Sequence, residues 1–372
     1  MGAIAFNPFY VLIGAPVLAF GLCVVALSVL LRLPRQYLIW DLPDRINAMH
    51  TNPTPRIGGL AIALAALCVL ALLPNSPALA ALAPLLMMTL VLIVISFFDD
   101  RWQLSPALRL TIHLAAALLI ALCWVHGLLF PSLFPSLFPL LLPSPAAASW
   151  LANPISIAAI ILAITWMTNL FNFMDGADGI AGGMAVFGFG SYAVAATLLP
   201  TTLGADANVN AIAFISVVIA GSAAGFLLFN FPPAKVFMGD AGAIPLGFLA
   251  GTLGIQGILN GLWGGWFPLV VFSPFIVDAS ATLAKRAWQR QKIWQGHREH
   301  YYQRLILSGW SHRRTALAYY FLMFLASASA LATQSARESA QSSHVILIAW
   351  VVIYSLLIVV TERRLTNNKN EK

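Results

Sequence analysis

The sequence predicts an all-α, polytopic integral membrane protein with about eleven transmembrane helices. Hydrophobic residues make up 60% of the 372 residues and charged residues only 9%, which is not the composition of a soluble domain. Apolar stretches of about 20 residues, long enough to cross a bilayer as a helix, recur along the whole chain. The predicted spans are 9–31, 57–74, 83–98, 107–128, 153–170, 179–199, 209–229, 243–262, 265–284, 315–334 and 344–361.

The basic residues predict how these spans are oriented. Every Lys and Arg except Arg337 falls in one alternate set of the segments between the spans. Segments on the cytoplasmic side of a membrane retain Lys and Arg, so the N-terminus is expected outside and the C-terminus inside. This placement also accounts for the net charge of +7, and we expect no nucleic-acid partner.

The acidic residues gather on the same predicted side. Only Asp206 and Glu338 fall in the opposite set of segments. Keeping charge out of lipid explains why acids lie in loops, but not why they avoid one face. We therefore predict a single transmembrane catalytic domain over residues 1–372. Its active face is built from the cytoplasmic loops 32–56, 99–109, 170–179, 230–242 and 285–314, and it holds a polyanionic substrate through Mg²⁺ and basic side chains.

The first acidic motif, Asp99–Asp100, ends the apolar run VLIVISFFDDRW. Consecutive helical residues point about 100° apart, so the two acids need not serve one site. One would hold Mg²⁺ or take a proton while the other pairs with Arg101 or Arg109. The alternative is a solvated helix end, although two acids at a helix C-terminus oppose the macrodipole.

The segment TNLFNFMDGADGIAGG, residues 168–183, is the most informative part of the sequence. It spaces Asn169, Asn172, Asp175 and Asp178 between glycines, and amide and carboxylate oxygens are the ligands that Mg²⁺ prefers. Backbone N–H groups at the start of the next helix suit a phosphate. A polar loop joining two apolar spans is the alternative interpretation.

Two further loops supply the remaining candidates. FNFPPAKVFMGDAG, residues 229–242, offers Asp240 as a second oxygen donor and Phe237 as a stacking surface. In GHREHYYQRL, the positions of His297, His300 and Arg304 fit one helical face pointing at phosphates, with Arg298 as a further candidate. Zinc is disfavoured because no HExxH pattern or nearby Cys is present. A membrane-surface amphipathic segment is the alternative.

Two single residues have weaker signals. Arg56, in HTNPTPRIGG, either touches phosphate or only anchors the second span at the membrane surface. Asp278, near the cytoplasmic end of the ninth span, is expected to be a structural partner of Lys285 or Arg286 rather than a catalyst.

Together these motifs resemble the polyprenyl-phosphate N-acetylhexosamine-1-phosphate transferases, a superfamily of the glycosyltransferase family 4 type. PTPRIGG, FFDD, NFMDGADGIAGG, VFMGDAG and the His-rich loop occur in the order seen in that superfamily, over roughly residues 45–310. The loop GHREHYYQRL departs from the run of histidines in the peptidoglycan enzyme and looks closer to the undecaprenyl-phosphate sugar-1-phosphate transferases that initiate O-antigen. The resemblance therefore implies a role in lipopolysaccharide or related cell-surface polysaccharide biosynthesis.

The resemblance also implies residue roles. Asn172 and Asp240 would coordinate Mg²⁺, with Mn²⁺ as an alternative ion, and the catalytic residues would be Asp99, Asp100 and Asp240. Substrate-binding roles would fall to Asn169, Asp175, Asp178, Asn230, Phe237, His297, Arg298, His300, Arg304, Arg56, Arg101 and Arg109. Gln103 stands where some relatives have Lys, so Arg101 or Arg109 would supply that charge.

The implied reaction takes place at the bacterial inner (plasma) membrane. The phosphate of undecaprenyl phosphate attacks the β-phosphorus of a UDP-N-acetylated sugar and expels UMP, by direct attack or through an aspartyl phosphate. The main alternative from another class is a multi-span secondary transporter of an anionic substrate, which would place ionisable groups near the bilayer midplane. The sequence leaves open which sugar is transferred, which of Asp99 and Asp100 acts as base, and whether the protein forms a homodimer.

Overall fold

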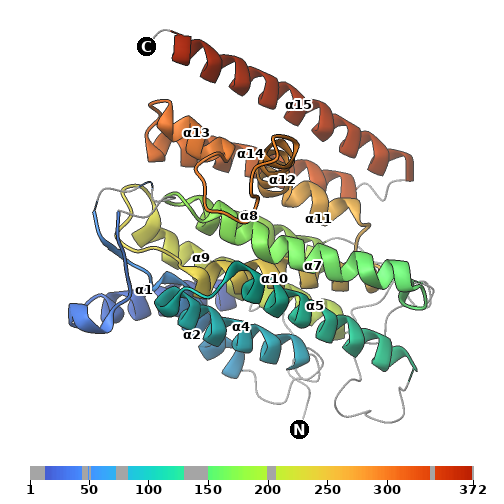
Figure 1. The fold of residues 1–372 in the computed structure, drawn as a ribbon. Coiled ribbons are helices and arrows are strands. Elements are labelled where there is room, and N and C mark those ends of the chain that lie inside the picture. The colour runs from blue at the N-terminus through green and yellow to red at the C-terminus, as the bar shows by residue number, and fades with distance from the viewer. Residues whose placement is uncertain are drawn as a thin grey trace.

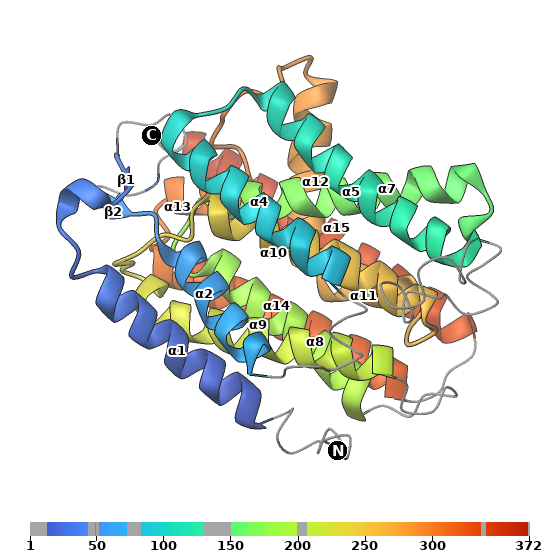
Figure 2. The same ribbon diagram turned by 90° about the horizontal axis from the view of Figure 1, so that it is seen from below.

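The described part of the protein is a bundle of helices (Figure 1) with one small antiparallel sheet (Figure 2). The computed structural model describes residues 13–43, 49, 52–72, 83–129, 150–198, 207–335 and 340–370. Their regular elements, in chain order, are α1 (Ala15–Leu30), η2 (Arg35–Tyr37), β1 (Trp40–Asp41), β2 (Thr54–Pro55), α2 (Gly58–Ala71), α4 (Ala83–Trp102), α5 (Pro106–Leu129), α7 (Pro154–Met174), α8 (Ile180–Leu198), α9 (Ala207–Asn230), α10 (Asp240–Leu259), α11 (Trp266–Val271), α12 (Ser273–Trp288), α13 (Tyr301–Leu307), α14 (His312–Ser335) and α15 (Ala340–Asn370).

The prediction of an all-α, polytopic membrane protein is confirmed. Among the described residues, 8 helices are long and apolar enough to cross a membrane, namely α4, α5, α7, α8, α9, α10, α14 and α15. The first two predicted spans appear as the shorter apolar helices α1 and α2. The total of eleven spans and the orientation of the termini stay predictions.

The ninth predicted span, 265–284, is not one helix but two, α11 and α12, which meet at Phe272. Pro274 has no N–H to donate to the carbonyl four residues earlier, and a proline ring also clashes with that carbonyl. The Ser273 hydroxyl instead donates to the Val270 carbonyl at 2.6 Å. The break lets α12 leave the direction of α11, as Figures 1 and 2 show, and extend toward the loop that precedes α13.

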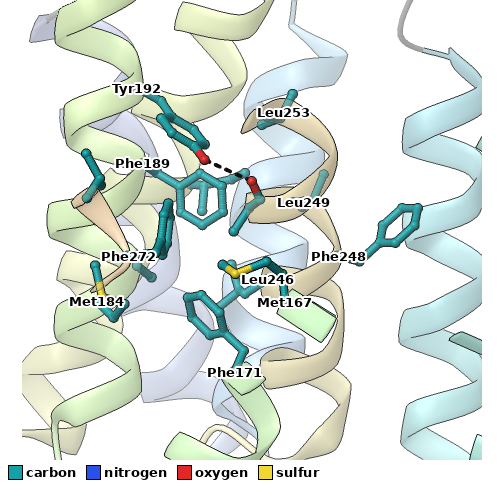
Figure 3. Packing of buried hydrophobic residues seen from close by; sticks show 14 of the residues in the cluster. Met167, Phe171, Met184, Phe189, Tyr192, Leu246, Phe248, Leu249, Leu253 and Phe272 are labelled. Atoms are coloured by element: carbon teal, nitrogen blue, oxygen red, sulfur yellow. Dashed lines mark hydrogen bonds between the residues drawn. The ribbon is translucent and has the colours of Figure 1, made fainter. Parts of the chain in front are cut away.

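The centre of the bundle is α10, which packs closely against α7. A Cβ on Gly247 would lie 2.5 Å from the Met167 carbonyl oxygen, so only glycine permits this approach. Beside this contact, Tyr192 donates a hydrogen bond to the Ala250 carbonyl at 3.0 Å across an aromatic cluster (Figure 3). This packing fixes the end of α7 relative to the beginning of α10, where the polar residues lie.

Candidate active site

The short sheet ties two distant sequence motifs together. β1 and β2 pair antiparallel, and the chain continues from β2 into a bridge with the loop before α10, where Phe237 N–H donates to the Pro55 carbonyl at 2.9 Å. Gly59 then meets α10 so closely that a Cβ would lie 2.3 Å from the Gly242 nitrogen. PTPRIGG and VFMGDAG therefore lie side by side and bring Arg56 near Asp240.

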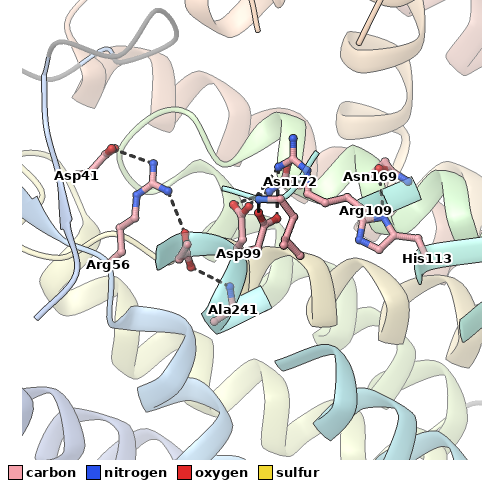
Figure 4. Close-up of polar contacts among 11 residues, drawn as sticks. Asp41, Arg56, Asp99, Arg109, His113, Asn169, Asn172 and Ala241 are labelled. Carbon is pink, nitrogen blue, oxygen red and sulfur yellow. Dashed lines mark hydrogen bonds and ion pairs between the residues drawn. The ribbon is translucent and has the colours of Figure 1, made fainter. Parts of the chain in front are cut away.

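Asp240 is in the first turn of α10, after Gly239 with φ +74°. Its carboxylate accepts a hydrogen bond from the Asn172 amide at 2.8 Å, and Arg109 lies 3.4 Å from its other oxygen (Figure 4). The same Arg109 nitrogen lies 3.5 Å from Asp99 Oδ2. Side chains from α4, α5, α7 and α10 thus meet at one point.

The two adjacent aspartates at the end of α4 have different partners. Asp99 Oδ1 accepts from the Leu104 N–H at 2.7 Å, whereas its buried Oδ2 has no hydrogen-bond partner among the described residues. Asp100 accepts from Arg56 at 2.9 Å and from the Ala241 N–H at 3.2 Å. Asp100 is therefore held in place on both sides, and Asp99 is the one that faces Asp240 and Arg109.

Arg56 links Asp100 to the sheet. Its second guanidinium nitrogen lies 2.8 Å from Asp41 Oδ1. Burial acts to lower the pKa of Arg56, but the charges of Asp41 and Asp100 outweigh it and raise the pKa above its ordinary value. Arg56 is consequently a permanent cation in this cluster and more than an anchor at the membrane surface.

Asn230 and Asp178 connect the glycine-rich loop to the loop before α10. The Asn230 side chain accepts from the Gly179 N–H and donates to the Val236 carbonyl, both at 2.8 Å. Asp178 accepts from the Ala234 N–H at 3.0 Å, and its other oxygen lies 3.5 Å from His312 Nδ1. Both residues therefore fix the shape of the site in addition to lining it.

A cavity of about 810 Å³ opens at this end of the bundle. The predicted site residues that line it are Arg56, Arg109, Asn169, Asn172, Asp175, Asp178, Asn230, Phe237, Asp240, His297 and His300. Loss of solvation raises the pKa of Asp175 well above its ordinary value, with the Arg56 charge opposing the rise. The structure thus brings together residues from five loops that the sequence placed on one face.

The His-rich loop forms one wall of this cavity, but not as the predicted helix. α13 begins only at Tyr301, so His297, His300 and Arg304 do not share a helical face as expected. The two imidazole rings still meet, with centroids 4.8 Å apart, and burial lowers the pKa of His297 from 6.5 to about 4. Arg304 turns away and binds both oxygens of Glu362, at 2.6 and 2.8 Å, because α13 packs against α15.

Several predicted residues do not line the cavity. Asp99 and Asp100 lie behind Asp240 and Arg56, Arg101 is exposed at the end of α4, and Arg298 and Arg304 lie outside the lining. The expected partners of Asp278 were also wrong. Lys285 pairs with Glu362 and Arg286 with Glu299, whereas Asp278 contacts the beginning of α13.

The sequence did not single out some residues that do line the cavity, among them Asp41, His113, Trp166, Gln303 and His312. His113 is one helical turn after Arg109 on α5, and its Nδ1 lies 3.2 Å from Asn169 Oδ1. Once Arg109 was a candidate, the i, i+4 spacing could have found His113. The others come from segments whose position depends on tertiary packing.

The acidic centre fits a divalent cation that prefers oxygen ligands. Asp99 and Asp240 share the single guanidinium of Arg109, and Asp99 Oδ2 is buried without a hydrogen bond. A half-turn of the Asn172 amide would present its oxygen beside Asp240. The described residues contain no group of three His, Cys, Asp or Glu of metal-binding geometry, and the candidate oxygen ligands here are Asp99, Asp240 and Asn172.

Comparison with known proteins finds one matching family and several relatives. The model of the family described as Glycosyl transferase family 4 matches residues 82–258. A probable undecaprenyl-phosphate N-acetylglucosaminyl 1-phosphate transferase of Bacillus subtilis is 29% identical over 290 residues, covering 77% of this chain and 75% of the relative. A decaprenyl-phosphate N-acetylglucosaminephosphotransferase of Mycobacterium tuberculosis is 28% identical over 298 residues, covering 74% and 71%.

A third relative matches over a shorter region. A phospho-N-acetylmuramoyl-pentapeptide-transferase of Halalkalibacterium halodurans is 32% identical over 175 residues, covering 46% of this chain and 48% of the relative. The motif order, the helical membrane fold and these matches all agree. The chain therefore matches glycosyl transferase family 4 over residues 82–258 and is similar to polyprenyl-phosphate N-acetylhexosamine-1-phosphate transferases, the superfamily that its motifs resemble.

Proposed function

We propose that this protein transfers a sugar 1-phosphate from a UDP-N-acetylated hexosamine to a polyprenyl phosphate such as undecaprenyl phosphate. One observation carries the proposal: Asp99, Asp240, Asn172 and Arg109 converge from four helices at the edge of a cavity of about 810 Å³. A cavity of this size accommodates a nucleotide sugar, and both substrates carry phosphates. Agreement with the names of the relatives supports the reaction class.

Mg²⁺ is the proposed cofactor, with Mn²⁺ as the alternative. Asp240 and Asn172 would hold the ion, and Asp99 is the nearby carboxylate with an unsatisfied oxygen. When bound, the ion supplies positive charge that offsets repulsion between two anionic substrates and stabilises the charge of the transition state.

The remaining site residues would orient the substrates. Phe237 offers its ring to the nucleobase, and Asp178 and Asn230 fix the loop beside it. His297 and His300 form the wall that would contact the diphosphate. Because loss of solvation keeps His297 neutral near pH 7, this residue would act as a hydrogen-bonding group rather than as a cation.

For the chemical step we favour direct attack. An oxygen of the lipid phosphate forms a bond to the β-phosphorus of the UDP-sugar while the bond to the bridging oxygen breaks, giving polyprenyl-diphospho-sugar and UMP. Asp99 is the better candidate to accept the remaining proton of the lipid phosphate, because both oxygens of Asp100 are occupied by Arg56 and the Ala241 N–H. The Asp99 oxygen that faces Arg109 has no hydrogen bond.

The finer assignments belong to this proposal as well. N-acetylglucosamine is the first sugar to test, because it appears in the names of two relatives. Priming of O-antigen is the proposed role, following from the departure of GHREHYYQRL from the histidine run of the peptidoglycan enzyme. We place the active site on the cytoplasmic side of a bacterial inner membrane, following the distribution of Lys and Arg.

The test is an assay of the purified protein in detergent with undecaprenyl phosphate, Mg²⁺ and a panel of UDP-sugars labelled in the β-phosphate. We expect the label to enter the lipid phase in a 1:1 ratio with UMP released, and both products to disappear when the lipid or Mg²⁺ is omitted. Uptake of a labelled anion into proteoliposomes without formation of UMP would instead indicate a transporter and overturn the proposal.

A further inference from the structure

A buried carboxylate outside the cavity lies beside His300, the wall residue that the proposed function places against the diphosphate. Asp278 lies on α12, is only 4% exposed and is not part of the cavity lining. Among the described residues, its one ion-pair partner is His300, whose Nδ1 lies 3.5 Å from Asp278 Oδ1. Burying a carboxylate lowers the stability of the fold unless nearby groups compensate its charge, so hydrogen-bond donors are expected around Asp278.

Asp278 holds the beginning of α13. Its Oδ1 accepts from the Tyr301 N–H at 2.8 Å, and its Oδ2 accepts from the Tyr302 N–H at 3.1 Å. These N–H groups belong to the first turn of the helix, where no carbonyl of the helix itself can accept from them. The Tyr319 hydroxyl of α14 also donates to Oδ2. Asp278 therefore joins α12, α13 and α14 just behind His300.

The beginning of α13 is also docked against the end of α7. The Tyr302 hydroxyl donates to the Phe173 carbonyl at 3.0 Å, and the His300 ring stacks on the Phe173 ring with centroids 6.1 Å apart. The fit is tight, since a Cβ on Gly176 would lie 2.1 Å from the Tyr302 hydroxyl oxygen. Any displacement of this turn would move His300 relative to Asn172, which is on the same last turn of α7 as Phe173.

We propose that Asp278 is a positioning residue that holds the His300 imidazole at the cavity wall. His300 Nδ1 is buried 3.5 Å from Asp278 Oδ1 and makes no hydrogen bond among the described residues, so in this proposal the Nε2 edge of the ring reaches the substrate. Carboxylates orient metal-binding histidines in this way, and their removal there typically costs about 10- to 100-fold in metal affinity or activity; we expect a loss of similar size for a histidine that contacts a diphosphate. The inference rests on the proposed function, in which His300 contacts the diphosphate of the UDP-sugar.

The test is a double-mutant cycle of Asp278→Asn and His300→Ala, measured as UMP release from UDP-N-acetylglucosamine. Asparagine keeps one carbonyl oxygen to accept from a backbone N–H but removes the charge. We expect Asp278→Asn to lower kcat/KM about 10-fold or more, mainly through KM for the UDP-sugar, and to have less than about a twofold effect in the His300→Ala background. Equal losses in both backgrounds would overturn the inference.

Tyr319→Phe is the matched control. It removes a hydrogen bond from the same carboxylate but leaves Asp278 beside His300, so we expect a lower thermal midpoint with kcat/KM unchanged. If Tyr319→Phe lowered kcat/KM as much as Asp278→Asn, the effect would be general loosening of the fold and the inference would be wrong.

A second readout does not depend on activity. The rate at which diethyl pyrocarbonate modifies His300, followed by mass spectrometry of the peptide, should rise severalfold in Asp278→Asn and stay unchanged in Tyr319→Phe. An unchanged rate in Asp278→Asn would overturn the inference by itself. Absence of UMP release by the wild-type protein would overturn the proposed function instead, so the two failures are distinguishable.

Discussion

Two clusters of acidic and basic residues distribute charge in opposite ways. At the end of α15, one carboxylate, Glu362, binds two cations, Lys285 and Arg304. At the beginning of α10, two carboxylates, Asp99 and Asp240, share one cation, Arg109. In the first cluster the cations compensate the carboxylate, and these ion pairs link α15 to α12 and α13. The second has more carboxylates than cations and a buried Asp99 oxygen that accepts no hydrogen bond among the described residues, which supports the proposed Mg²⁺.

The largest effect on activity should come from removing a negative charge at the Asp99–Asp240 cluster. We expect Asp240→Asn to lower kcat for UMP release by at least about 100-fold, because it removes both a ligand of the proposed Mg²⁺ and a partner of Arg109. Thermal stability in detergent should fall little, since asparagine can still hydrogen-bond to Asn172. Full activity in Asp240→Asn would show that catalysis does not need the negative charge at the Asp99–Asp240 cluster.

The shared guanidinium gives the next prediction. Arg109→Gln should lower kcat about 10-fold or more, and half-maximal activation should occur at a lower Mg²⁺ concentration, because two carboxylates then lack a competing cation. Arg101→Gln, at the end of α4, is the matched control. Arg101 is exposed, so its loss should change neither quantity by more than about twofold. A higher Mg²⁺ requirement in Arg109→Gln would contradict the charge argument.

A substitution in the Glu362 cluster should lower stability but leave activity almost unchanged. Glu362→Gln breaks charged hydrogen bonds with Lys285 and Arg304 at a partly exposed site, so we expect a loss of about 1–2 kcal/mol in stability. That loss should lower the thermal midpoint by a few degrees while kcat stays within about twofold of wild type. A fall in kcat without loss of stability would show that Arg304 contacts substrate, as the sequence suggested.

The smallest expected effect concerns pH. Because the pKa of His297 is lowered to about 4 in the folded protein, the unfolded chain binds a proton at this residue more readily below pH 6.5. The neutral folded form is therefore favoured above pH 6.5, and that advantage is lost progressively as pH falls toward 4. His297→Gln should reduce the fall in thermal midpoint between pH 7 and pH 4. An identical fall in both proteins would show that His297 is not desolvated.

Much of the fold followed from local sequence properties. Apolar stretches, broken by polar and glycine-rich segments, located each of the 8 described helices that are long enough to span a membrane, because a bilayer core admits only backbone that satisfies its own hydrogen bonds. The exception was the span 265–284, where Pro274 breaks the helix. Prolines within helices are sometimes tolerated, as Pro245 is in α10, so sequence alone could not decide between a kink and a break.

The candidate site was less predictable than the fold. The residues of the glycine-rich loop and the loop before α10 were found because several oxygen-bearing side chains lie within a few positions of each other. His113 and His312 were missed because each is a lone histidine in its segment. Arg304 was assigned to phosphate because its spacing from His300 suits a helix, but α13 turns that face toward Glu362 on the last helix of the chain.

By itself, the sequence determined the membrane class, pointed to the family and grouped the loops that meet at one cavity, because hydropathy and short motifs depend on local residue order. Only the tertiary structure decided which charges meet. It paired Asp100 with Arg56, left Asp99 and Asp240 to share Arg109, and set Asp278 behind His300. Such pairings depend on distances of a few ångströms between helices far apart in the chain. Those distances are set by close packing at residues such as Gly59, Gly176 and Gly247, which no charge pattern reveals.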